Sequence, residues 1–528
     1  MRRREFLKYT ASATVLPSII DGFSVKAFAA SPLLSALQGA ATDNDHVLVM
    51  IQLTGGNDGL NMVIPLDVYD KYQAARTNIA IQQGKVLPLV NNIKTGLHPS
   101  MTGIQQLYND GKACIIQSVG YPSPNFSHFR ATDIWITGSN ANEVLTTGWG
   151  GRYLNFEYPN FPEGFPNADA PDPLAIQIGS IISPAFQGPA ANMGVAITSA
   201  TDFYDLLENP QQDPVPNTHW GNELTYIRLV AKQADKYSDT IKLAASKVTQ
   251  QGPYPDTSLG RQLKIVARLI AGGLKTRMYM VSTGGFDTHA SQANAGDTST
   301  GLHANLLGGV SDAVKAFMDD LTRLKASRRV VGMTFSEFGR RIKSNGSMGT
   351  DHGAAAPMIV FGDYVLQGVL GNSPNIPDAS SVNDNIPMQY DFRSVYASIL
   401  EQWFCVKEAD LKTILLEDYQ RLPIVSGIAC GLITGTDDIN QNAGTNYITN
   451  YPNPFTDKTY IKYKTKGGHT MIQIFDTMGR LLQVPVNKVH TPGEYTITFD
   501  GEQLPNGVFY ARFQNGATQQ VRTMLKVR

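Results

Sequence analysis

The sequence has few cysteines and few charges, and its net charge is close to zero. Only 3 of the 528 residues are cysteine and only 17% are charged, against roughly 25% in an average soluble domain. A chain this long with so few cysteines is not a small scaffold held together by disulfides. Its 44 Lys and Arg nearly balance 45 Asp and Glu, which argues against nucleic-acid binding through a basic surface.

Motifs of several other protein classes are also missing. Three cysteines, Cys114, Cys405 and Cys430, allow at most one disulfide, and Cys114 lies in an apolar run where we expect a buried thiol. No Cys/His spacing typical of zinc is present. No segment after the N-terminus is apolar enough to be transmembrane. The nucleotide motifs G-x-G-x-x-G and G-x-x-x-x-G-K-[ST] and the G-x-S-x-G elbow are absent, which disfavours a nucleotide-dependent enzyme.

The charge is unevenly distributed along the chain. Residues 1–30 hold five basic and two acidic residues, residues 31–445 hold 29 basic and 38 acidic residues, and residues 446–528 hold ten basic and five acidic residues. The chain is therefore an acidic body between two basic ends.

Residues 1–30 have the pattern of an export signal. The basic stretch RRREFLK is followed by an apolar run from Tyr9 to Ile20 and then by Ala27-Phe28-Ala29, a small-x-small cleavage site. The apolar run is shorter than the about 20 residues that span a bilayer. Arg3-Arg4-x-Phe6-Leu7-Lys8 resembles the twin-arginine consensus, which implies passage through the twin-arginine translocase after folding.

Apolar runs alternate with helical patterns through residues 45–425. The runs at 46–53, 113–119, 174–178, 277–281, 330–335 and 357–361 predict buried strands. Amphipathic spacing predicts helices at 100–108, 260–270, 302–324 and 393–404, the last capped by Asp391. This alternation predicts an α/β fold with a mostly parallel sheet and helices on both faces. The stretch 140–213, rich in Pro, Gly and Asn, is expected to form loops over one sheet edge.

The C-terminal part has a different composition. Residues 431–446 read as a flexible linker. Beyond them, alternating strands at 459–463, 471–475, 495–499 and 508–513 predict a small all-β sandwich over residues 447–528.

This C-terminal part resembles the type A sorting domain of the type IX secretion system. The resemblance rests on Tyr451-Pro452-Asn453-Pro454-Phe455, Met478-Gly479-Arg480, Leu504-Pro505-Asn506-Gly507-Val508-Phe509 and a basic terminus at 523–528. It implies transport across the outer membrane of a Bacteroidota-type bacterium, followed by secretion or surface attachment and removal of the domain. A carbohydrate-binding sandwich is disfavoured because no exposed aromatic platform is evident.

Polar side chains with metal-ligating groups follow the ends of the predicted strands. Ligands of open α/β sheets bind where the strands end at their carboxyl side. The candidates are Asp58, Ser127, Asp287, His289, Glu337, Asp351 and His352. Carboxylates and imidazoles that come from separate strand ends are suitable donors for a divalent metal, and a neighbouring hydroxyl is a candidate nucleophile.

Five of these segments resemble the domain-of-unknown-function 1501 family. They are LTGGNDGLN, SHFRATDIW, GGFDTHASQ, FSEFGRR and GTDHG, and the resemblance covers roughly residues 45–425. That family is similar to the alkaline phosphatase and sulfatase superfamily. The resemblance implies a three-layer α/β/α sandwich with a two-metal site and a Ser, Thr or formylglycine nucleophile.

Carried over residue by residue, the resemblance makes Asp58, Asp287, His289 and His352 metal ligands and Ser127 the nucleophile. The Asp-His pair of the superfamily aligns either with Asp351-His352 or with Glu337-Phe338, so Glu337 and Asp351 are both candidate ligands. One metal or an altered pair is therefore expected, and zinc, calcium, magnesium and manganese all suit mixed oxygen and nitrogen donors.

Together these features predict an exported, metal-dependent hydrolase of phosphate or sulfate esters. Ser127 is expected to attack the substrate, and Arg340 or Arg341 to bind its anionic group. Because the body is acidic, a local metal site rather than the overall field would attract the anion. The alternative is a noncatalytic secreted or surface-attached binding protein that keeps the fold, suggested by Phe338 in place of a histidine and by the short Asp287-x-His289 spacing.

Overall fold

The structure is a computed structural model. It describes residues 45–198, 237–426 and 430, most of 447–527, and two short strands, β1 (Ile19–Ile20) and β2 (Phe23–Ser24). The rest of the predicted signal segment and the linker 431–446 lie outside the described residues. The interpretations of those two segments stay predictions.

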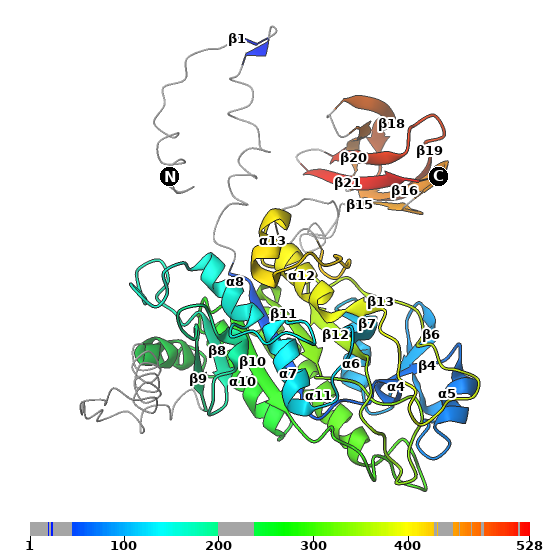
Figure 1. Cartoon of the computed structure of the whole chain (residues 1–528). Coiled ribbons are helices and arrows are strands. Elements are labelled where there is room, and N and C mark those ends of the chain that lie inside the picture. The colour runs from blue at the N-terminus through cyan, green and yellow to red at the C-terminus, as the bar shows by residue number, and fades with distance from the viewer. Residues whose placement is uncertain are drawn as a thin grey trace.

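A nine-stranded sheet forms the centre of the α/β part (Figure 1). Its strand order is β13-β7-β12-β11-β3-β10-β8-β9, and β14 also pairs with β7. The strands are β3 (Val47–Leu53), β7 (Ala113–Gly120), β8 (Ala175–Ile178), β9 (Gly194–Ile197), β10 (Met278–Thr283), β11 (Val330–Phe335), β12 (Ala356–Gly362), β13 (Gly368–Leu370) and β14 (Tyr390–Asp391). All six predicted strands are present, with ends shifted by at most two residues.

The sheet is mostly parallel, as predicted, and β12 is the exception. This strand pairs antiparallel with both β11 and β7, whereas β11, β3, β10 and β8 pair parallel. The beginning of β12 therefore lies at the same sheet edge as the carboxyl ends of its neighbours. Residues just before β12 and residues just after β10 are consequently brought to one edge.

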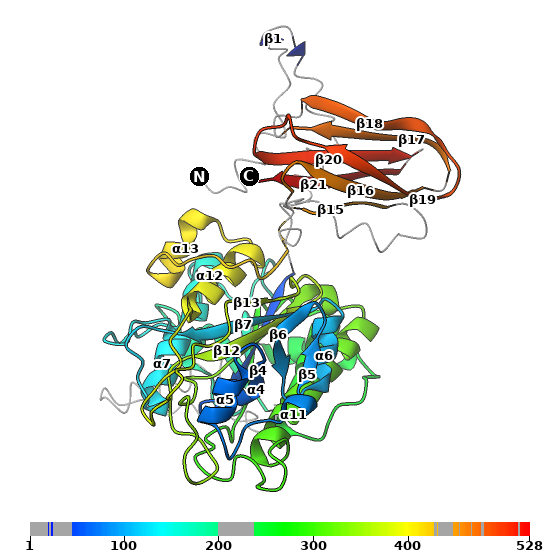
Figure 2. The same cartoon turned by 90° about the vertical axis from the view of Figure 1, so that its right-hand side faces the viewer.

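Helices cover both faces of the sheet, which gives three layers (Figure 2). In β3, Val47, Val49 and Ile51 pack into one core, while Leu48 and Met50 pack into another, as the alternation of side chains along a strand requires. The first core includes α6 (Thr102–Asn109), α10 (Ser258–Ala271) and α11 (Leu302–Arg323), and the second includes α7 (His128–Thr137), α8 (Trp149–Glu157), α12 (Phe392–Gln402) and α13 (Glu408–Leu415).

The predicted helices are present as α6, α10, α11 and α12. Asp391 caps α12, because its side chain accepts the backbone N–H of Arg393 at 2.9 Å. The stretch 140–213 is more regular than expected in its described part: it contains α8, the predicted β8 and the edge strand β9. Short helices α4 (Gly59–Met62) and α5 (Tyr69–Ala75) and a small sheet of β4 (Val63–Pro65), β5 (Leu87–Leu89) and β6 (Asn92–Leu97) follow β3.

The C-terminal part consists of two antiparallel sheets, as the alternating pattern predicted. One has the order β15-β16-β19 and the other β18-β17-β20-β21. The strands are β15 (Tyr447–Tyr451), β16 (Lys458–Thr465), β17 (Gly468–Phe475), β18 (Leu481–His490), β19 (Gly493–Asp500), β20 (Gly507–Asn515) and β21 (Thr518–Lys526). The prediction missed β15, β18 and β21.

Cys405 and Cys430 form a disulfide with Cα atoms 5.3 Å apart. Cys114 is a free, buried cysteine, as expected. Among the described residues, no helix is long and apolar enough to cross a membrane.

Candidate metal centre

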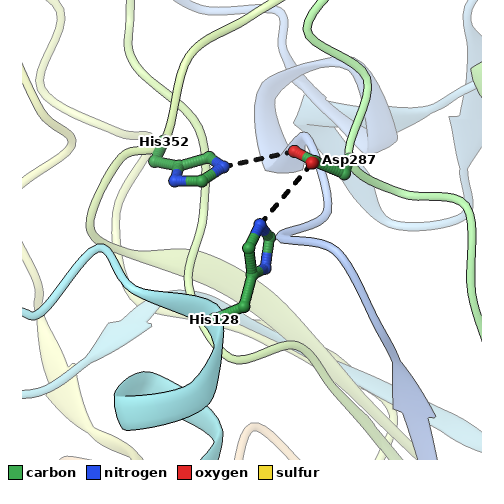
Figure 3. A group of neighbouring side chains, drawn as sticks. All are labelled: His128, Asp287 and His352. Atoms are coloured by element: carbon green, nitrogen blue, oxygen red, sulfur yellow. Dashed lines mark hydrogen bonds and ion pairs between the residues drawn. The ribbon is translucent and has the colours of Figure 1, made fainter.

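Three side chains from separate segments converge at the carboxyl edge of the sheet (Figure 3). His128 is the first residue of α7, Asp287 follows β10, and His352 precedes β12. One ligand atom from each lies within 4.8 Å of the other two. The Nε2 of His352 is 3.2 Å from Asp287 Oδ1, and the Nε2 of His128 is 3.6 Å from Asp287 Oδ2.

A third imidazole lies at the same point. The Nε2 of His289 is 3.1 Å from Asp287 Oδ1 and 3.0 Å from the Nε2 of His352. Ligand atoms that share one zinc ion at about 2.0–2.1 Å lie within roughly 4 Å of one another. The contacts of Asp287 with His289 and His352 meet this condition.

The outer ring nitrogen of each histidine faces a hydrogen-bond acceptor. The Nδ1 of His128 is 2.8 Å from Glu337 Oε1, and that of His289 is 3.1 Å from Asp351 Oδ1. The Nδ1 of His352 is 2.9 Å from the carbonyl oxygen of Phe126. Each acceptor requires a proton on Nδ1, which leaves the lone pair of a neutral ring on Nε2.

This tautomer has an electrostatic consequence. Three Nε2 lone pairs then point toward the Asp287 carboxylate, and two of them are 3.0 Å apart. Such an arrangement of acceptors is repulsive unless a cation lies between them. Protonation of the rings removes this repulsion, and a bound divalent metal removes it as well. The structure therefore fits a metal, with His128, Asp287 and His352 as ligands and His289 beside them.

The pKa values of two of these groups are shifted. Partial burial raises the pKa of Asp287, but the hydrogen bond from Arg340, the contact with His352 and the charge of Arg340 together outweigh it and lower the pKa to about 2. Burial lowers the pKa of His352, although its contact with Asp287 acts in the opposite direction. The carboxylate is therefore charged and the His352 ring is disposed to be neutral, which is the form that ligates a metal.

Close packing of the loops requires glycine at two positions. Gly55 has φ of 122°, and a Cβ atom there would lie 2.4 Å from the backbone nitrogen of Asp287. A Cβ atom on Gly349 would lie 2.3 Å from the backbone carbonyl of His289. The glycines in the LTGGNDG and GTDHG segments thus allow neighbouring loops to approach the ligand-bearing loop directly.

Arg340 connects these loops from inside and is not placed to bind a substrate anion. Its side chain is fully buried. The guanidinium donates to the carbonyl oxygens of Gly55, Gly56, Phe286 and Thr350 and to Asp287 Oδ1. The predicted role of Arg340 as an anion clamp is therefore corrected. Arg341 packs over the ring of Phe126 at 5.2 Å and donates to the carbonyl of Asn383.

Asp58 is outside the metal centre. Its carboxylate has no exposed surface and accepts hydrogen bonds from Arg76 Nη1 at 2.5 Å and Gln292 Nε2 at 2.6 Å. Burial raises the pKa of Asp58, but the charges of Arg76 and His303 and the hydrogen bonds from Arg76 and Gln292 together outweigh burial and lower the pKa. Arg76 and Gln292 thus occupy Oδ2 of Asp58, and Asp58 lies outside the group of His128, Asp287 and His352, so its ligand role stays a prediction.

Glu337 and Asp351 contact the Nδ1 atoms of His128 and His289, on the side of each ring away from Asp287. Glu337 is fully buried and also accepts the backbone N–H of Gly55 at 2.8 Å. Asp351 accepts from Asn345 Nδ2 at 3.1 Å, and this hydrogen bond lowers its pKa. Both residues were predicted as ligands; in the structure each contacts a histidine of the candidate centre, and their ligand roles stay predictions.

Of the predicted site residues, the structure brings Asp287, His289 and His352 together. Ser127 directly precedes His128 and is exposed, and no hydrogen bond from its hydroxyl is present among the described residues. The sequence interpretation missed His128, although it quoted the SHF segment. The sequence did offer a signal for His128, because its imidazole directly follows the predicted nucleophile Ser127.

Two family models match the chain. Residues 207–411 match the family described as protein of unknown function (DUF1501), and residues 449–527 match the secretion system C-terminal sorting domain. Both resemblances seen in the sequence are confirmed over these ranges. The sorting domain shows that the protein is exported by the type IX secretion system to the outer surface of a Bacteroidota cell.

None of the curated proteins matches the chain. Among solved structures, a protein of the alkaline phosphatase superfamily from Vibrio parahaemolyticus is 11% identical over 93% of this chain and 84% of its own, with a TM-score of 0.30. A sulfatase from Pseudoalteromonas sp. is 10% identical over 89% and 87%, with a TM-score of 0.33.

The match to dimeric latent PorU from Porphyromonas gingivalis is of a different kind. It is 16% identical over 16% of this chain and only 9% of PorU, with a TM-score of 0.14. At these scores, the activities of the similar structures are no guide to the activity of this chain.

Proposed function

We propose that the protein is an exported metalloenzyme that hydrolyses phosphate or sulfate esters at the His128, Asp287 and His352 centre. The observation that carries the proposal is the orientation of the three histidines. Each has its Nδ1 against an acceptor and its Nε2 toward Asp287. Histidines that ligate a metal are commonly oriented in this way by a carboxylate or a carbonyl.

The donor set favours zinc over calcium and magnesium. Imidazole nitrogens suit zinc and its neighbours in the transition series, whereas calcium and magnesium prefer oxygen ligands. With two or three imidazoles and one carboxylate, the centre has the composition of a catalytic zinc site. Because Asp58 is held by Arg76, we propose a single metal rather than a pair.

An anionic ester suits the surroundings of the centre. His128 begins α7, whose first turn has no side-chain cap hydrogen bond. The backbone N–H groups of such a turn and the positive end of the helix favour an anion beside the metal. A bound divalent cation would supply Lewis-acid stabilisation of charge on the nonbridging oxygens of the ester.

The residues of this chain have distinct parts in the proposal. Glu337 and the Phe126 carbonyl keep the Nδ1 protons of His128 and His352 in place, and Arg340 holds Asp287 charged. Ser127 remains the proposed nucleophile, because its exposed hydroxyl stands next to His128 at the start of α7. Removing any ligand is expected to abolish both metal binding and hydrolysis.

A noncatalytic metal-binding protein is the second candidate. It is favoured by one observation: Arg340, the arginine nearest the centre, is fully engaged with backbone carbonyls and Asp287. In that case the chain would bind metal without hydrolysing esters.

A substrate panel separates the two candidates. The purified zinc-loaded protein is tested with aryl phosphate monoesters, phosphate diesters and sulfate esters, alongside Ser127→Ala and a control, Ser123→Ala, on the same loop. The enzyme proposal predicts turnover that is lost in Ser127→Ala and kept in the control. Metal binding without turnover of any ester would support the binding protein, and turnover that persists in Ser127→Ala would refute Ser127 as the nucleophile.

A further inference from the structure

The structure assigns a positioning role to Gln292, which we propose fixes the spacing of the two loops that carry Asp287, His289 and His352. The inference rests on the proposed metal centre. The side chain of Gln292 is 1% exposed, and all three of its hydrogen bonds go to other buried side chains. None of those partners is itself a proposed ligand.

The amide oxygen of Gln292 joins the two loops. It accepts the hydroxyl of Thr288 at 2.9 Å and the hydroxyl of Thr350 at 2.9 Å. Thr288 lies between Asp287 and His289, and Thr350 lies two residues before His352. A single oxygen atom therefore contacts both ligand-bearing segments at once.

The amide nitrogen of Gln292 holds the side chain in place. Its Nε2 is 2.6 Å from Asp58 Oδ2. An ionised carboxylate only accepts hydrogen bonds, so the group facing Asp58 must be the NH2, and the oxygen must face the threonines. The orientation of the amide is thus fixed by the chemistry of its partners.

Asp58 provides a rigid support. Arg76 binds its carboxylate and also donates to the carbonyl oxygens of Arg341 and Ile342 at 2.8 and 2.9 Å. Arg76, Asp58 and Gln292 are all buried. A continuous chain of hydrogen bonds therefore runs from Arg76 through Asp58 and Gln292 to the two threonines, and it explains why Asp58 is near the site without ligating the metal.

The side-chain hydrogen bonds of Gln292 add to the backbone hydrogen bonds between the two loops by fixing the orientation of Thr288 and Thr350. The two loops exchange backbone hydrogen bonds from Thr350 N to Thr288 O at 3.1 Å and from Gln292 N to Met348 O at 2.8 Å. These bonds set which residues lie side by side. The hydroxyl bonds to Gln292 hold Thr288 and Thr350 on the buried side. Asp287 and His289, on either side of Thr288, therefore face the opposite, exposed side, and half-buried His352 follows Thr350 by two residues.

The experiment measures zinc affinity by competition with a chelator, and folding by thermal unfolding, on the full chain. Gln292→Met removes the amide, and Thr288→Val and Thr350→Val each remove one hydroxyl with little change in volume. Thr334→Val is the matched control: Thr334 is equally buried, lies in β11 and accepts one backbone N–H from Ile359. Loss of partners just outside the ligands typically weakens metal affinity about 10- to 100-fold.

We expect an affinity loss in this range for Gln292→Met, a smaller loss for each threonine variant, and wild-type affinity for Thr334→Val. If Gln292→Met does not fold, the two threonine variants decide by the same criterion. Wild-type zinc affinity in folded Gln292→Met, or in both threonine variants, would overturn the inference and leave the metal centre intact. Failure of the wild-type protein to bind zinc would instead refute the proposed function, and the inference with it.

Discussion

The Nδ1 of His128 lies 2.8 Å from Glu337 Oε1, an atom that also accepts the backbone N–H of Gly55 at 2.8 Å. Glu337 has no exposed side-chain surface. The carboxylate thus ties the first residue of α7 to the glycine turn after β3 and determines which nitrogen of His128 carries the proton. Glu337, predicted as a ligand, orients His128, which we propose as a ligand.

Glu337→Gln is expected to weaken zinc binding about tenfold, in line with other partners of metal-ligating histidines. The amide keeps an oxygen for Gly55 but removes the negative charge that makes the His128 ring a better donor. Chelator competition measures the affinity. Glu502→Gln, an exposed position in the sorting domain, serves as the control, and equal affinities of the two variants would contradict the assigned role.

Asp58→Asn is expected to destabilise the fold by about 3–5 kcal/mol, the cost of breaking a buried ion pair by removing one partner. Chemical denaturation gives the free energy of unfolding. The exposed pair Lys71 and Asp378, 2.8 Å apart, is the comparison: Asp378→Asn is expected to change the free energy of unfolding far less, because exposed ion pairs contribute little. Equal effects at the two positions would show that Asp58 is not an internal support.

The stability difference between wild type and Asp58→Asn should depend on pH. Although burial acts in the opposite direction, Arg76, His303 and Gln292 together lower the pKa of Asp58 below its ordinary value. The stabilisation is therefore complete above the pKa of the unfolded chain, about 3.9, and is lost as the pH falls through the lower pKa of the folded state. Unfolding at pH 7 and pH 3 tests this, and a difference that grows on acidification would contradict it.

The disulfide joins Cys405 and Cys430, which are 25 positions apart in the sequence, and the loop it closes contains α13. Cys405→Ser/Cys430→Ser is expected to lower the free energy of unfolding by about 3 kcal/mol, mainly because the unfolded chain is less constrained. A reductant should destabilise the wild type to the same extent and leave the double variant unchanged. An unaltered wild type under fully reducing conditions would refute the stabilising role.

The sorting domain has its own hydrophobic core, whose buried residues all lie between Ile448 and Met524. Deletion of residues 447–528 is therefore expected to leave the melting temperature of the α/β part unchanged while preventing delivery to the cell surface. Fractionation of a type IX-competent host measures delivery. Ile472→Asp, which places a charge in this core, should mislocalise the protein similarly, and surface delivery of either variant would contradict the account.

The sequence was sufficient to predict six strands of the central sheet, helices on both of its faces and the sheet edge that carries the candidate site, but not β9, β13, β14, β15, β18 or β21. Alternating apolar runs and strand-end polar residues are local signals, and β3, β10 and β11 follow them closely. The direction of β12 was not predictable, because antiparallel pairing with β7 and β11 is a property of the assembled sheet.

The roles of individual site residues were harder to predict. The position of Asp58 after a strand predicts a ligand, but in the structure Arg76, at the end of α5, binds its carboxylate. Likewise, whether Ser127 or His128 faces the centre depends on where α7 begins. Such contacts join residues through space, and no spacing along one sequence encodes them.

The central claim is most directly tested by the metal content of the purified full chain after dialysis against zinc and removal of unbound metal. The account predicts about one zinc per chain for the wild type and for His469→Ala, an exposed histidine of the sorting domain, and none for His352→Ala or Asp287→Ala. A wild-type protein without zinc, or ligand variants that retain the full equivalent, would contradict it.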